Sequence, residues 1–148
     1  MSVCQTIAVI GDIHYGSARD GEHHGDIGDI LLHRAVAYLN DIVQPDVTLL
    51  MGDILDDGDT PDGVVKRAVL QDVLRDLRGP RIVIPGNHDG EIDAFYRTFS
   101  HPPDIMNVAG MRVLPFIDED RPEYWAERPA TELDRFRKAR QDFDGPII

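Results

Sequence analysis

Four aspartates fall within a stretch of seven residues, Asp53, Asp56, Asp57 and Asp59, shortly after an apolar run at 47–51. Carboxylates at this spacing repel one another, so the stretch is tolerable only where water or bound cations neutralise it. One interpretation is therefore a site for divalent metal ions. The other is a solvated acidic turn that leads into a helix, and the stretch alone does not decide between them.

Side chains that bind metals also follow two other apolar runs. Asp12 and His14 come after the first apolar run, and their spacing of two residues puts both on one side of an extended backbone. Asn87 and His88 come after the run 81–85. Each motif alone is a weak signal, because a lone Asp-x-His is more often a capped turn with an exposed histidine. Three such motifs at the ends of three apolar runs favour the metal interpretation.

The elements that must position these residues form a β-α-β-α-β unit. Short, near-continuous apolar runs predict buried parallel strands at 6–10, 47–51 and 81–85. Apolar residues at helical spacing predict amphipathic helices over 27–43 and 60–78. In such a unit the three strands end at one edge of the sheet, which is where open α/β sheets bind their ligands.

The apolar stripes of the two helices predict which side chains face the sheet. The stripe of the first helix comprises Ile27, Ile30, Leu31, Ala35, Leu39 and Ile42. The stripe of the second comprises Val65, Val69, Val73 and Leu77.

The remaining chain predicts a smaller set of elements. Residues 91–99 form a short helix or turn, and 106–108 pairs with 111–117 as a hairpin. The charged residues 118–120 are interpreted as a solvated connection.

A last helix is expected to begin at Thr131, which with Asp134 resembles a capping box. Its inward residues are expected to be Leu133, Phe136 and Phe143. Residues 147–148 resemble the start of another buried strand. We therefore expect residues 1–148 to form a single domain that is incomplete at its C-terminus.

Composition narrows the possible partners and the compartment. The chain has 148 residues, and 15 Lys and Arg against 27 Asp and Glu give a net charge of −12, which argues against a broad nucleic-acid-binding face. Cys4 is the only cysteine, so no internal disulfide can form. The first residues lack the basic region of a signal peptide, and Ile7–Ile10 is too short to span a membrane. We expect a cytoplasmic protein.

The motifs Asp12-x-His14, Gly52-Asp53-x-x-Asp56 and Gly86-Asn87-His88-Asp89 occur in this order along the chain. The sequence thereby resembles the calcineurin-like metallophosphoesterase superfamily over essentially its whole length. The resemblance implies an α/β fold, the αββα sandwich of that superfamily, of which this chain is the amino-terminal portion. It also implies hydrolysis of phosphomonoester or phosphodiester bonds in a phosphorylated small molecule or a phosphodiester substrate.

The resemblance assigns metal ligands residue by residue. Asp12 and His14 would bind a first metal ion, Asp53 would bridge two ions, and Asn87 would bind the second. Two divalent ions can hold a hydroxide between them and neutralise the charge that develops in an in-line displacement. Mixed Asp, His and Asn ligands suit Mn, Fe or Zn better than Ca.

The resemblance also assigns a catalytic pair. His88 would act as general acid or stabilise the phosphoryl oxygens, with Asp56 orienting it. Protonation of the leaving oxygen needs a group that titrates near neutrality, which favours a histidine over another carboxylate. Asp89 would either support the ligands from outside the coordination sphere or only close a turn, and we favour the turn.

The sequence departs from the superfamily pattern after His88. Members continue with a further histidine and a Gly-His-x-His motif, and nothing later in this chain can play those parts; His101 has the wrong setting. The remaining ligands are expected beyond residue 148 or on a second chain, rather than from His23 and His24. The alternative is a non-catalytic metal-binding or scaffold module with a degenerate site. A dinucleotide-binding domain is excluded because no Gly-x-Gly-x-x-Gly follows the first strand.

Overall fold

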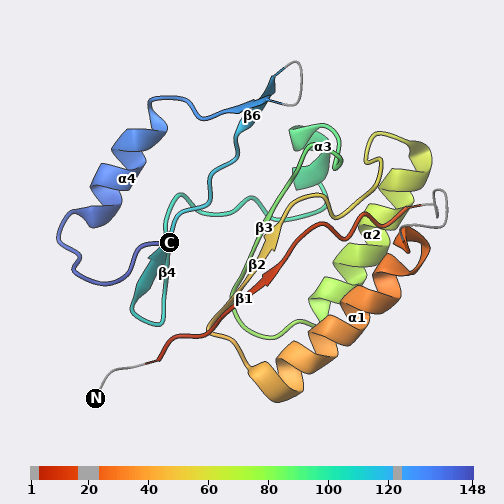
Figure 1. Cartoon of the computed structure of the whole chain (residues 1–148), viewed down its shortest axis with the longest axis horizontal. Helices are drawn as coiled ribbons and strands as arrows, with labels where there is room; N and C mark the ends of the chain where they lie inside the picture. The colour runs from red at the N-terminus through yellow and green to blue at the C-terminus, as the bar shows by residue number, and fades with distance from the viewer. Residues whose placement is uncertain (1–3, 17–23, 122–124) are drawn as a thin grey trace. The chain divides into compact units, whose positions relative to one another are not determined.

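The computed structural model describes residues 4–16, 24–121 and 125–148. The chain divides into two compact units, Met1–His101 and Pro102–Ile148. Figure 1 traces the elements of each unit. Within the described ranges, no helix combines the length and the apolar character needed to cross a membrane.

The first unit contains the predicted β-α-β-α-β arrangement. Strands β1 (Ile7–Ile10), β2 (Val47–Met51) and β3 (Arg81–Ile84) form a parallel sheet in the order β1-β2-β3. Helices α1 (Gly28–Tyr38) and α2 (Pro61–Arg75) connect consecutive strands (Figure 1). The prediction of a mixed α/β fold built on a parallel sheet is confirmed.

Short helical segments complete the first unit. A 3-10 turn, η1 (Gly25–Ile27), precedes α1, and a π-helical turn, η2 (Leu39–Val43), continues it. The predicted helix 27–43 is therefore a composite of different helical types. Helix α3 (Ile92–Tyr96) occupies part of the range in which a short helix or turn was expected.

Both helices pack on the same face of the sheet. The core contains Leu32 and Val36 of α1, Leu70 and Leu74 of α2, and the sheet residue Leu50. Strand pairing places Ile10, Leu50 and Val83 side by side on this face. Because the register is parallel, the ends of the three strands lie next to one another at one edge of the sheet.

The predicted helix faces are partly wrong. In α1, Ile30 and Leu31 are about half exposed, whereas Leu32 and Val36 are buried. Leu31 and Leu32 are adjacent apolar residues, so periodicity alone cannot choose the buried stripe. In α2, Val65 is exposed, and the buried face includes a charged residue that hydropathy assigns to solvent; this face comprises Gly63, Arg67, Leu70 and Leu74.

The second unit contains two hairpins and a helix. Strands β4 (Met106–Val108) and β5 (Met111–Val113) pair antiparallel, as do β6 (Glu119–Arg121) and β7 (Trp125–Glu127). Helix α4 spans Glu132–Arg140. The predicted hairpin at 106–117 is thus shorter than expected, and the charged segment at 118–120 enters a strand.

Details of the second unit correct the sequence interpretation. Thr131 precedes α4 but makes no capping hydrogen bond with its side chain. Leu133 and Phe136 are exposed by 58% and 50%, so they do not face inward. Ile148 pairs with β5, because its N–H donates to the carbonyl of Arg112, yet it is 47% exposed. The chain end is strand-like in its hydrogen bonding without being buried.

Replacement of Tyr96 by Phe is expected to leave stability at neutral pH unchanged or to raise it by up to about 1 kcal/mol. The hydroxyl of Tyr96 is buried with no hydrogen-bond partner in the described part of the chain. Its burial raises the pKa of Tyr96 from 10.0 to about 12. The folded state therefore holds this proton where the unfolded state has lost it, and the contribution to stability falls as pH rises from 10.0 to about 12.

Urea unfolding of wild type and Tyr96→Phe at neutral pH and near pH 11 measures this effect. The loss of stability at high pH should be smaller in the variant. Tyr38→Phe is the control. Tyr38 is 59% exposed, so the same substitution there should leave the free energy of unfolding unchanged at both pH values. A pH dependence identical in wild type and Tyr96→Phe would contradict the prediction.

Candidate metal centre

The segments that follow β1 and β2 remain paired beyond the ends of the strands. The N–H of His14 donates to the carbonyl of Asp53 at 2.9 Å, and the N–H of Tyr15 donates to Ile54 at 2.9 Å. The N–H of Asp56 donates back to the carbonyl of Tyr15 at 3.3 Å. The backbone thereby places the first and second sequence motifs side by side.

The turn after β3 contacts the segment that follows β2 through a side chain and through the backbone. The N–H of His88 donates to Oδ1 of Asp53 at 3.0 Å. The carbonyl of His88 accepts from the N–H of Gly58 at 2.8 Å. All three motifs consequently meet at the carboxyl edge of the sheet, as the sequence predicts.

Asp12, His14 and Asp53 form a first group of potential metal ligands. Nε2 of His14 lies 3.8 Å from Oδ1 of Asp12 and 4.0 Å from Oδ2 of Asp53. These distances are too long for hydrogen bonds. They suit atoms that each bind one ion at roughly 2.1 Å, because such ligand atoms lie up to about 4.2 Å apart across the ion.

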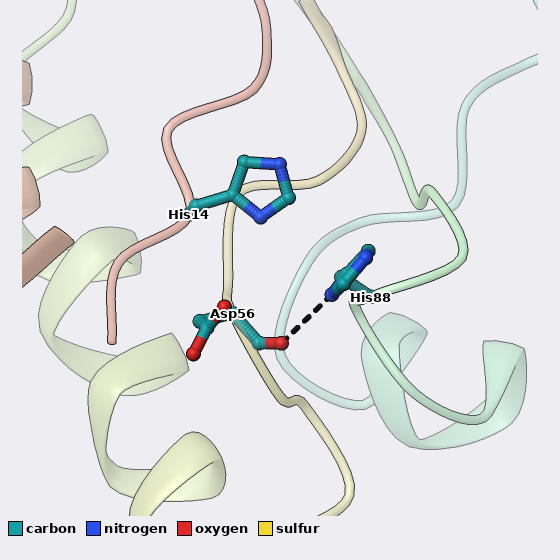
Figure 2. Close-up of side chains that lie close together, drawn as sticks. All are labelled: His14, Asp56 and His88. Carbon is teal, nitrogen blue, oxygen red and sulfur yellow. Dashed lines mark hydrogen bonds between the residues drawn. The ribbon is translucent and has the colours of Figure 1, made fainter. Parts of the chain in front are cut away.

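His14, Asp56 and His88 form a second group, in which one potential ligand atom from each residue lies within 4.8 Å of the others. Figure 2 shows the three side chains gathered around a common space. The two imidazole rings meet edge to face, with centroids 4.8 Å apart and an interplanar angle of 81°. His14 belongs to both groups, so the two groups are contiguous.

A main-chain hydrogen bond sets the orientation of His88. Its Nδ1 lies 2.8 Å from the carbonyl oxygen of Asp56, the contact drawn as a dashed line in Figure 2. A carbonyl oxygen only accepts, so Nδ1 carries the hydrogen. In the neutral ring the lone pair is then on Nε2, which is the nitrogen left to meet a ligand.

Three of the candidate ligands have strained backbone conformations. Asp12, His14 and Asp53 have φ values of 52°, 45° and 48°. These are three of the six non-glycine residues with positive φ in the described ranges. Such conformations are unfavourable for L-residues and concentrate at functional sites, where the surrounding structure holds them. The hydrogen bonds between the segments that follow the strands therefore hold these residues in a conformation that local propensity does not favour.

Asn87 and Asp89 occupy the turn after β3 in different environments. Asn87 is exposed, whereas Asp89 is fully buried. Oδ1 of Asp89 accepts from the N–H of Leu55 at 2.9 Å, and Oδ2 accepts from Gly86 at 2.8 Å. Burial raises the pKa of Asp89, and these hydrogen bonds oppose the rise. Asp89 therefore closes its turn, as predicted, and also ties that turn to the loop after β2, which the sequence did not reveal.

Of the other histidines considered from the sequence, the two that the structure describes do not join these groups. His101 stacks on Tyr96, with ring centroids 4.4 Å apart. His24 is exposed at the start of η1, and His23 lies outside the described residues. Among the residues that the structure describes, the groups draw on the three strand-end motifs alone.

A cavity of about 240 Å³ adjoins the second group. Asp56 lines both the cavity and the group. Nζ of Lys66 lies 2.6 Å from a carboxylate oxygen of Asp62 in its wall. The remaining wall residues are Tyr15, Gly16, Asp57, Thr60 and Gly63. The wall thus offers both hydrogen-bond donors and acceptors next to the candidate ligands.

Gly52→Ala is expected to destabilise the fold by about 2–4 kcal/mol and to weaken metal binding. Gly52 has φ of +80°, and an added Cβ would lie 2.6 Å from the backbone nitrogen of Gly86. Alanine there would force apart the loops after β2 and β3. The control is Gly79→Ala. Gly79 has φ of +82°, but an added Cβ would meet only the carbonyl oxygen of Pro45, at an ordinary contact distance of 3.9 Å, so this variant measures the backbone penalty without crowding. Urea unfolding should show the larger loss for Gly52→Ala, and equal losses would contradict the crowding argument.

Comparison with known proteins adds independent information. A family model described as calcineurin-like phosphoesterase matches residues 5–141. Among solved structures, the chain is similar to a protein of unknown function, AQ665 from Aquifex aeolicus. That similarity has 17% identity and a TM-score of 0.40, over 93% of this chain and 71% of the other. No curated protein matches the chain.

Proposed function

The chain belongs to the calcineurin-like phosphoesterase family, and from this premise we propose that it is a phosphoesterase that uses two divalent metal ions to hydrolyse phosphomonoester or phosphodiester bonds. The observation that carries the proposal is that the ligand group of Asp12, His14 and Asp53 lies at the carboxyl edge of the parallel sheet, in contact with the turn that carries Asn87 and His88. Family membership alone indicates a metal-binding hydrolase domain. The finer assignments depend on the residues present.

The donor set fits divalent ions of the Mn, Fe or Zn type, because it combines carboxylates with imidazoles. Asp12, His14 and Asp53 would hold the first ion. Asp53 would also bind the second, together with Asn87. In support, Oδ2 of Asp53 faces His14, while its Oδ1 accepts the N–H of His88 in the turn that carries Asn87.

Bound ions would supply positive charge that stabilises the phosphoryl oxygens during in-line displacement. The protein's own contribution centres on His88. The carbonyl of Asp56 holds the Nδ1 hydrogen of this ring, so in the protonated, imidazolium form Nε2 is the atom that would deliver a proton to the leaving oxygen, which leaves the ring neutral. Asp56 would therefore orient His88 through its main chain.

The substrate would place its leaving group in the cavity beside Asp56. That cavity is roughly the size of a small organic group, and its polar wall suits an alcohol that carries hydrogen-bonding atoms. We therefore assign a phosphorylated small molecule or a small phosphodiester as the substrate.

Further ligands would complete both metal sites. The first group supplies three side chains, and Asp12 is 82% exposed, which leaves coordination positions open toward solvent. We propose that a segment beyond residue 148 or a second chain supplies the remainder. This arrangement would make metal affinity depend on whether that segment is present.

Titration of metal-free protein with Mn²⁺ or Zn²⁺, followed by assay of nitrophenyl phosphate and bis(nitrophenyl) phosphate, tests the proposal. We expect two equivalents of metal and hydrolysis that requires them. The assay should be run on this chain and on a version extended past residue 148. Bound metal without hydrolysis in either protein would favour the non-catalytic module, and no bound metal would contradict both.

A further inference from the structure

A buried arginine joins the two segments that follow β2 and β3. Nη2 of Arg67, on α2, donates to the carbonyl of Gly58 and to the carbonyl of Asp89, both at 2.8 Å. Arg67 is only 2% exposed. We propose that Arg67 is a positioning residue of the metal centre, which fixes the spacing between the loop 52–59 and the turn 86–90. The inference rests on the proposed function and assigns a role that no sequence motif indicates.

The guanidinium acts at the point where the two backbones touch. The N–H of Gly58 donates to the carbonyl of His88 at 2.8 Å. A Cβ on Gly58 would lie 2.1 Å from the carbonyl oxygen of Asp89, so only glycine permits this approach. One nitrogen of Arg67, with two hydrogens to donate, therefore bridges a carbonyl on each side of the contact.

Arg67 is an unfavourable choice for packing alone. Its Nε is buried with no hydrogen-bond partner within the described ranges. Burial lowers the pKa of Arg67, although the carboxylates of Asp89 and Asp59 oppose this. An apolar side chain of similar size would fill the space beside Phe95 without burying a charge. What the guanidinium adds is the pair of hydrogen bonds to the two site loops.

The spacing between the loop 52–59 and the turn 86–90, which Arg67 sets, directly affects the positions of the candidate ligands. His88 precedes Asp89, and its N–H and Nδ1 contact Asp53 and the carbonyl of Asp56. If the contact at Gly58 loosens, the side chains on the two loops are no longer held at fixed positions relative to one another. Groups that orient metal ligands from outside the coordination sphere change metal affinity by roughly 10–100-fold when removed. We expect an effect of that size for Arg67.

The experiment compares Arg67→Met, Arg67→Lys and Leu74→Ala in the full chain. Leu74 is the control because it is buried on the same helix but has no hydrogen-bonding side chain. Calorimetric titration with Mn²⁺, thermal unfolding and amide hydrogen exchange are measured for each protein. Arg67→Met should bind Mn²⁺ roughly 10–100-fold more weakly and exchange faster at the amides of Leu55, Gly58 and Gly86. Leu74→Ala should melt earlier yet keep the wild-type Mn²⁺ affinity.

The outcomes separate this inference from the proposed function. Wild-type affinity in Arg67→Met, or an equal loss in Leu74→Ala, would overturn the positioning role. If wild type itself bound no Mn²⁺, the proposed function would fail, but hydrogen exchange would still test the loop contact. Faster exchange in Arg67→Met, confined to 53–59 and 86–91, would support the contact, and unchanged exchange would refute it. Should Arg67→Met fail to fold, Arg67→Lys serves as the second variant. Lysine keeps the charge, but its side chain is one bond shorter, so its nitrogen does not reach the position of Nη2. It is expected to show the same loss of affinity, and wild-type affinity would refute the role.

Discussion

Asp53→Asn is expected to abolish binding of both metal ions and to lower kcat/KM for an aryl phosphate by at least about 1,000-fold. The carboxylate of Asp53 faces His14 through Oδ2 and the turn of His88 through Oδ1. Asparagine keeps the shape but replaces one oxygen with an NH2 group, which cannot coordinate a cation. The loss of the proposed bridging oxygen and of negative charge should therefore act on both proposed sites together.

Metal analysis and steady-state kinetics on a catalytically competent, extended chain measure this result. Asp57→Asn is a matched control, because Asp57 is an exposed carboxylate of the same loop that belongs to neither ligand group. It changes the net charge equally and should leave metal content unchanged. Full metal content in Asp53→Asn would show that the bridging assignment is wrong.

His88→Ala is expected to lower kcat by about 100- to 10,000-fold while metal content stays nearly intact. The ring is held by the carbonyl of Asp56 so that Nε2 is available for proton transfer. Removal of the ring takes away the proposed proton donor and leaves the proposed ligands Asp12, His14, Asp53 and Asn87 in place. The defect should shrink for substrates with a good leaving group, since these need protonation less.

Comparison of nitrophenyl phosphate with an alkyl phosphate of similar size tests that dependence. His33→Ala is the control, because His33 is exposed on α1 and belongs to neither ligand group. A large loss of metal in His88→Ala would instead indicate that the second group, His14, Asp56 and His88, is itself a coordination site.

Much of the first unit could be predicted because its signals are strong and local. Apolar runs at 47–51 and 81–85 predict strands, and glycine directly after each run marks where the chain turns. Helix faces were predicted less well, since Arg67 is buried for reasons that hydropathy does not contain. In the second unit, the short strands and the exposed Leu133 and Phe136 carry no comparable pattern.

The candidate site was predictable as a set of residues but not as a network. Spacing and residue type identify Asp12, His14 and Asp53, and the structure brings them together. The contacts that hold them involve main-chain groups, such as the carbonyls of Gly52 and Asp53, which accept from the N–H groups of Asp12 and His14. Every residue has a carbonyl, so no sequence pattern distinguishes the ones that accept these hydrogen bonds.

The hydrogen bond from His88 to the main chain at residue 56 has a consequence for how this region can vary. Any amino acid at that position presents the same carbonyl, so point changes there should leave the imidazole orientation unaltered. Gain or loss of a single residue between 53 and 56 would instead shift a different carbonyl into place. For the orientation of His88, the length of this segment therefore matters more than the identity of the residue at position 56.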